Sequence, residues 1–81
     1  METYTPTPEE VQKHISAAFD SVNLINQTIT KPEEEKGKKA VKRNYQHLEV
    51  MMGKDWFSTA LTPTQKSDIE SAISSGKSYS A

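Results

Sequence analysis

One short stretch near the C-terminal end, Ser75-Gly76-Lys77-Ser78, has the residue types of a phosphate-binding loop. In such loops, backbone amides and a lysine hold the phosphates, and the loop lies between a strand and a helix. The complete motif also needs an earlier glycine, and Ser71 occupies that position. A helical pattern precedes Gly76, and none follows it. We therefore interpret Gly76 as the end of a helix and expect no bound nucleotide.

Histidine and serine are the other residues with catalytic or metal-binding chemistry. The histidines are His14 and His47, and neither belongs to an HExxH pair that would place two metal ligands on one helix face. His47 and Glu49 lie on different sides of a helix because they are two positions apart. Cysteine is absent, and no serine lies in a G-x-S-x-G turn. We expect no enzyme, metal, other cofactor or small-molecule substrate.

A run of cations is the strongest sign of nucleic-acid binding, since basic side chains on a helix can follow a phosphate backbone. The three acidic residues at 33–35 directly precede this run and would repel phosphates at one end. We interpret the run as a solvated, salt-bridged helix face, with protein contact and nucleic-acid binding as alternatives. Its members are Lys36, Lys38, Lys39, Lys42 and Arg43.

Composition indicates one small domain with a thin core. The chain has 81 residues, 33% of them hydrophobic, and a formal net charge of -1, which gives no overall attraction to nucleic acid or anionic membranes. The absence of cysteine disfavours a small secreted domain, because such domains usually depend on disulfides. The N-terminal residues lack the basic and apolar regions of a secretory signal. No stretch approaches the roughly 18 apolar residues of a membrane span.

Three similar segments predict three helix starts. Thr7-Pro8 and Thr62-Pro63 are each followed by an acidic or amide residue, Glu10 or Gln65, at the spacing of a capping box. Proline suits the first helical position because the amide there has no partner within the helix. Lys31-Pro32 has a poor capping residue, although Thr30 stands beside it.

The first predicted helix runs from Pro8 to about Ile29. Its apolar residues alternate at spacings of four and three, which places them on one face. This face is expected to be the main core surface, and part of it could serve an oligomer. The residues are Val11, Ile15, Ala18, Val22, Ile25 and Ile29.

The remaining elements are predicted from the same signals. The second helix begins near Pro32 and ends at Gly53 in a left-handed cap. A short helical turn surrounds Trp56. The last helix runs from Pro63 to about Ser75 and stops at Gly76. The expected fold is all-α, a single domain over residues 1–81 built as a three-helix bundle with a long first helix, and with residues 1–7 and 77–81 as frayed tails.

The interface candidates follow from how completely the other predicted helices can pack against the first helix. In the second helix, apolar partners occur only from Ala40 onward, so an antiparallel arrangement would leave the Ile25 end poorly covered. Two adjacent aromatic residues also fit poorly into a thin core, and aromatics and methionine are enriched in protein contacts. We therefore expect a protein partner or a homo-oligomer, with Ile25, Ile29, Met51, Trp56 and Phe57 as interface candidates.

Part of the sequence resembles small proteins encoded by tailed bacteriophages. The similar residues lie between 43 and 79 and include Arg43-Asn44, His47-Leu48-Glu49, Trp56-Phe57 and Ala72-Ile73. The first helix has no part in the resemblance. The resemblance implies a phage origin and a location in the virion or the host cytoplasm. We expect a non-enzymatic protein–protein interaction module, either a virion component or a small accessory factor acting on a host protein. The alternative is a nucleic-acid-binding protein that uses the basic face of the second helix.

Overall fold

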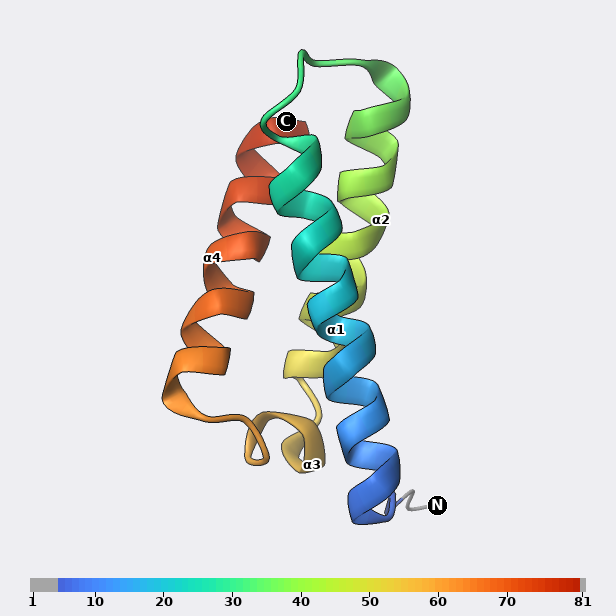
Figure 1. Cartoon of the computed structure of the whole chain (residues 1–81), viewed down its shortest axis with the longest axis vertical. Coiled ribbons are helices and arrows are strands. Elements are labelled where there is room, and N and C mark those ends of the chain that lie inside the picture. The colour runs from blue at the N-terminus through green and yellow to red at the C-terminus, as the bar shows by residue number, and fades with distance from the viewer. Residues whose placement is uncertain (1–4, 81) are drawn as a thin grey trace.

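The computed structural model describes residues 5–80 and confirms the all-α fold. Within that range there are three long helices and one short helix, and no strand: α1 (Pro8–Thr28), α2 (Glu35–Met52), α3 (Asp55–Ser58) and α4 (Pro63–Ser80). Figure 1 shows α2 running antiparallel to α1, and α4 running parallel to α1. The short helix α3 lies at the end of the bundle where α1 begins.

The first helix begins where the sequence predicts and ends one residue earlier than predicted. The Thr7 amide donates a 2.9 Å hydrogen bond to the Glu10 carboxylate, and the Glu10 amide donates one of 3.2 Å to the Thr7 hydroxyl. These two bonds form the predicted capping box. Ile29 caps the C-terminal end, so the helix ends one residue before the predicted boundary.

The predicted start of the second helix at Pro32 is wrong, because α2 begins at Glu35. Glu34 is the cap residue, in an extended conformation with φ -136° and ψ 150°. Thr30 does not cap this helix, because its hydroxyl donates a 2.7 Å hydrogen bond to the Gln27 carbonyl at the end of α1. The Pro32 carbonyl accepts a 3.4 Å hydrogen bond from the Tyr79 hydroxyl. The residues before α2 therefore belong to the connection between helices.

The predicted left-handed cap at Gly53 is also wrong. Gly53 has φ -77° and ψ -8°, a right-handed conformation. Its amide donates hydrogen bonds to the carbonyls of Glu49 and Val50, and the Lys54 amide donates to Met51. A right-handed turn suits this position because α3 begins only two residues later, at Asp55.

The last helix is longer than predicted. The Thr62–Gln65 capping box is present, with bonds of 2.9 and 3.1 Å. The helix then passes through Gly76, where a stop was predicted, and continues to Ser80. Residues 77–80 are thus helical in the region where fraying was expected, and residues 1–4 and 81 lie outside the described part of the chain.

A close helix contact explains the continuation through Gly76. This residue is buried, and a Cβ atom on it would lie 3.1 Å from Val41 Cγ1 and 3.2 Å from Tyr45 Cδ2. Glycine therefore allows α4 to approach α2 closely. Gly76 is needed here because it has no side chain, and it provides no left-handed cap.

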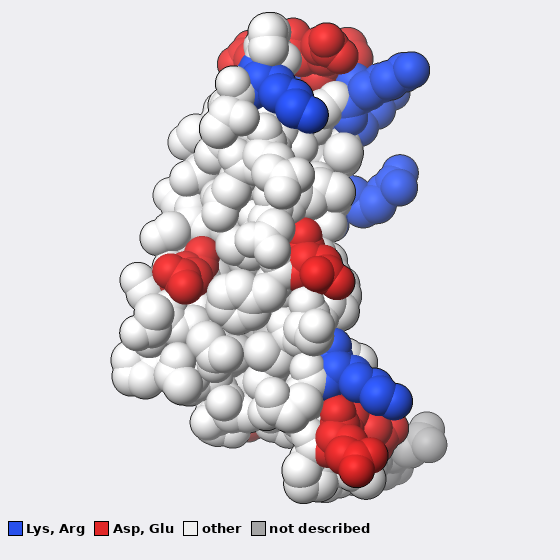
Figure 2. Space-filling model, viewed as in Figure 1, with Lys and Arg blue, Asp and Glu red and all other residues white. Residues whose placement is uncertain are grey.

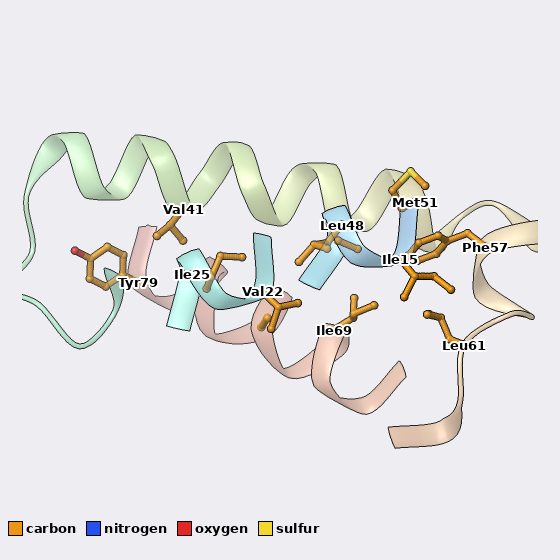
Figure 3. Packing of buried hydrophobic residues seen from close by; sticks show 12 residues of the cluster. Ile15, Val22, Ile25, Val41, Leu48, Met51, Phe57, Leu61, Ile69 and Tyr79 are labelled. Carbon is orange, nitrogen blue, oxygen red and sulfur yellow. The ribbon is translucent and has the colours of Figure 1, made fainter. Parts of the chain in front are cut away.

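One apolar core connects all four helices. Figure 3 shows Phe57, Met51, Ile15 and Leu61 at one end of the core, and Val41, Ile25 and Tyr79 at the other. The expectation that the Ile25 end is poorly covered is wrong, because Ile25 is 0% exposed. Tyr79 lies at this end in Figure 3, and its hydroxyl bonds to Pro32 in the α1–α2 connection. The buried members are Ile15, Ala18, Val22, Ile25, Val41, Leu48, Met51, Phe57, Leu61, Ile69, Ala72 and Tyr79.

Candidate interaction face between α1 and α4

Two uncharged segments meet on one side of the bundle. Charged residues make up 26% of the chain, yet residues 21–30, which are the end of α1 and the two residues after it, and residues 71–76 of α4 contain none. The two helices run side by side in parallel (Figure 1), and both segments border a single groove. We call the exposed surface along this groove the α1–α4 face.

The groove has a volume of about 310 Å³. The N-terminal half of α4 lies farther from α1 than its C-terminal half does, and the helices thus diverge along the groove (Figure 1). Phe19 and Val22 contribute its apolar surface, and both belong to or pack against the core. The polar lining consists of Asn23, Asn26, Asp68, Ser71 and Ser75.

The polar side chains of the groove are unpaired within the described chain. In residues 5–80, none of these five side chains makes a hydrogen bond or an ion pair. Asparagine amides and serine hydroxyls each donate and accept hydrogen bonds, and the Asp68 carboxylate accepts them. The groove therefore offers donors and acceptors that have no partner within the described chain, together with a half-buried aromatic ring at one end.

The charge distribution separates this face from its surroundings. Figure 2 shows a broad surface without Lys, Arg, Asp or Glu over the upper halves of α1 and α4, with separate acidic patches lower down. Basic and acidic side chains gather at the top and upper right, where α2 begins, and a second mixed group lies at the lower right, near the start of α1 (Figures 1 and 2).

The five predicted interface residues do not form one surface. Ile25 and Phe57 are 0% exposed and Met51 is 5% exposed, so these three side chains pack in the chain's own core. Ile29 and Trp56 are half-buried. Ile29 follows the last turn of α1, whereas Trp56 is in α3 at the opposite end of the bundle. An interface role for these two residues stays a prediction.

Trp56 belongs to an aromatic cluster that closes the end of the core. Its ring centroid lies 5.1 Å from that of His14, at an interplanar angle of 58°. The Phe57 ring lies 6.2 Å away and nearly perpendicular, at 85°. His47, the second histidine, is exposed on α2. The two histidines are thus on different helices, with one of them in packing contact with an aromatic ring.

The predicted basic residues lie on the first turns of α2. Lys36, Lys39, Lys42 and Arg43 are exposed. Lys38 is half-buried and pairs with Glu33 at 3.6 Å. Because residues 36–43 cover more than two helical turns, their side chains spread around the outer side of α2. The cations are available for contact, but they do not line a groove that the structure describes.

An ion pair also connects α2 and α4, outside the candidate face. Lys77 Nζ lies 2.8 Å from the Glu49 carboxylate, and both side chains are largely exposed. The hydrogen bond to Glu49 raises the pKa of Lys77. Exposed pairs of this kind contribute little to stability, so its main effect is on the orientation of these side chains.

Residues 5–80 contain no group of three or more histidine, aspartate or glutamate side chains arranged to hold a metal ion. In the same part of the chain, no helix has the length and apolar composition needed to span a membrane.

Sequence reasoning missed the α1–α4 face. The signal that could have found it is the pair of uncharged segments in a chain rich in charge, since each segment alone has the pattern of an ordinary helix. Their proximity depends on the packing of α4 beside α1, which the sequence does not state. In comparisons with known proteins, no family model, no curated protein and no solved structure matches the chain.

Proposed function

We propose that the chain is a non-enzymatic protein–protein interaction module that binds its partner through the α1–α4 face. The observation that carries the proposal is the surface without charged side chains over the upper halves of α1 and α4 (Figure 2), which borders a groove whose lining contains one charged residue, Asp68. Charged residues are depleted at the centres of protein interfaces, where aromatic residues are enriched. Phe19 supplies a half-buried aromatic ring at one end of the groove, next to polar side chains.

The partial resemblance to tailed-bacteriophage proteins supports a phage setting for this module. Within it, the chain would be a virion component or a small accessory factor that acts on a host protein. Nothing in this proposal requires a cofactor. The groove lining consists of amide, hydroxyl, aromatic and aliphatic groups, with one carboxylate.

Photo-crosslinking from the face tests the proposal. The chain has no cysteine, so Asn23→Cys introduces a single thiol that can carry a benzophenone label. The labelled protein is irradiated in an extract of the organism that encodes it, or of the infected host for a phage. We expect discrete protein adducts, and unlabelled wild-type protein should compete for them.

The matched control is Gln46→Cys, because Gln46 is an exposed amide on α2 outside the groove. Unlabelled Ser71→Arg should fail to compete, since it places a charge in the groove, whereas unlabelled Gln46→Arg should compete like wild type. Equal labelling from residues 23 and 46, or equal competition by both arginine variants, would contradict the proposal.

A further inference from the structure

We infer that the α1–α4 face pairs with the same face of a second copy of this chain across a two-fold axis. This inference rests on the proposed function and names the partner. It follows from the chemistry of the face, the direction of its two helices and the position of the Asp68 carboxylate in the groove.

The hydrogen-bonding groups of the face are complementary to themselves. Asn23, Asn26, Ser71 and Ser75 each carry a donor and an acceptor, so two identical sets can satisfy one another. If a partner placed charged side chains opposite these residues, binding would remove water from those charges without supplying an opposite charge. The partner surface should therefore be uncharged and polar. On the side of the molecule that Figure 2 shows, the upper halves of α1 and α4 carry such a surface, and Asp68 is the charged residue in the groove lining.

The direction of the helices favours an antiparallel pair. Because α1 and α4 run parallel, a two-fold axis that lies in the plane of the face and perpendicular to the helices places both helices of the second copy antiparallel to those of the first (Figure 1). The dipoles of facing helices then point in opposite directions, which is electrostatically favourable. The small side chains of Ser71 and Ser75, one turn apart on α4, permit close approach of the opposite helices.

The order of residues along the groove gives the pairing. Phe19 and Asp68 are at one end, Asn23 and Ser71 in the middle, and Asn26 and Ser75 at the other end. An axis at the level of Ser71 brings the Asn26 amide of one copy to the level of Phe19 and Asp68 of the other. The two Asp68 carboxylates then lie at opposite ends of the interface, so they do not repel one another.

Analytical ultracentrifugation of the complete chain tests this pairing. We expect the mass to rise from the 9.1 kDa of the monomer toward twice that value over the high micromolar range. Ser71→Arg and Ser71→Asp should each remain monomeric. A residue near a two-fold axis faces the same residue of the second copy, so two like charges would meet. An equimolar mixture of the two variants should recover the dimer, since opposite charges then meet. Circular dichroism verifies that each variant remains helical.

Gln46→Arg and Gln46→Asp are the matched controls on α2, and both should dimerise like wild type. A wild-type chain that stays monomeric, or Ser71 variants that dimerise separately as well as together, would overturn the pairing. The crosslinking experiment distinguishes this failure from failure of the proposed function. Adducts to a different protein from residue 23 would retain an interaction module without self-pairing, whereas the absence of any specific adduct in a monomeric protein would remove both.

Discussion

At the scale of single residues, Gly53 and Gly76 differ in whether the structure has room for a side chain. A methyl group on Gly76 would lie 3.1–3.3 Å from side-chain atoms of Val41 and Tyr45, whereas one on Gly53 would have the Val50 carbonyl oxygen as its nearest neighbour, at 3.4 Å. Gly53 is also exposed and right-handed, so alanine fits its backbone. The same substitution therefore has opposite expected effects at the two positions.

We expect Gly76→Ala to lower the free energy of unfolding by about 1 kcal/mol, because overpacking against Val41 and Tyr45 exceeds the gain in helix propensity. Gly53→Ala should raise it by about 0.5 kcal/mol by restricting the unfolded chain. Urea denaturation followed by circular dichroism measures both changes. A stabilised Gly76→Ala variant would show that α4 does not approach α2 as closely as described.

The Thr7–Glu10 capping box predicts a pH dependence of stability. The hydrogen bond from the Thr7 backbone amide lowers the pKa of the Glu10 carboxyl below its ordinary value. A carboxyl with a lowered folded-state pKa contributes stability above its unfolded pKa, and this contribution is lost as the pH falls through the folded value. The stabilisation from Glu10 should therefore be present at neutral pH and absent in strong acid.

Glu10→Gln should melt at a lower temperature than wild type at neutral pH, and the difference should vanish in strong acid, below the lowered pKa of Glu10, where both side chains are uncharged. Thermal unfolding by circular dichroism at the two pH values measures this. Glu9→Gln is the control, because Glu9 lies in the same first turn outside the capping box. A Glu10→Gln difference that persists unchanged in acid would contradict the assigned role of the carboxylate.

At the scale of helices, the last turn of α4 closes one end of the core. Tyr79 is buried there, and its hydroxyl bond to Pro32 is long at 3.4 Å. Tyr79→Ala should cost about 3 kcal/mol from lost aromatic packing. Tyr79→Phe should lower the free energy of unfolding by less than about 1 kcal/mol, because it removes only the hydroxyl and its weak hydrogen bond. Chemical denaturation of both variants checks the ratio, and equal losses would indicate that the hydroxyl carries the contact.

The first turns of α2 carry the cations of the nucleic-acid alternative. Replacing Lys38, Lys39 and Lys42 with glutamine should leave helicity and the melting temperature nearly unchanged, because surface changes have small effects. If nucleic acid is a partner, the triple variant should also show a flatter dependence of affinity on salt concentration. Fluorescence anisotropy with duplex and single-stranded probes measures this. Absence of wild-type binding at low salt would remove the alternative.

The sequence predicted those helix boundaries that depend on nearby residues. Thr7 with Glu10 and Thr62 with Gln65 are local pairs, so they place the starts of α1 and α4 correctly. The end of α4 was missed because the role of Gly76 depends on Val41 and Tyr45 in another helix.

The α1–α4 face was missed for the same physical reason. It exists through the packing of two segments that are about 45 residues apart in the chain, with Asn26 on one side and Ser71 on the other. The predicted interface residue Ile25 was assigned from the composition of α2 alone, and the cover that Tyr79 provides at that end comes from α4.

At the scale of the whole molecule, the core is continuous from the aromatic cluster around Trp56 to Tyr79 at the other end. We expect one cooperative unfolding transition, as in most small single domains. Trp56 fluorescence reports on the α3 end, and far-ultraviolet circular dichroism reports on all helices. Their urea transitions should coincide. Separate midpoints would show that the α3 end opens independently of the rest.

The odd number of long helices also determines how this domain could be joined to other chains. The start of α1 and the end of α4 lie at opposite ends of a body whose longest extent is 41 Å (Figure 1). A circular permutant would need a linker of at least about 12 extended residues to connect these ends, whereas many domains have neighbouring termini that a short loop can join. Two proteins fused to these two ends would be held apart by the length of the bundle, so the domain would serve as a rigid spacer in such a fusion.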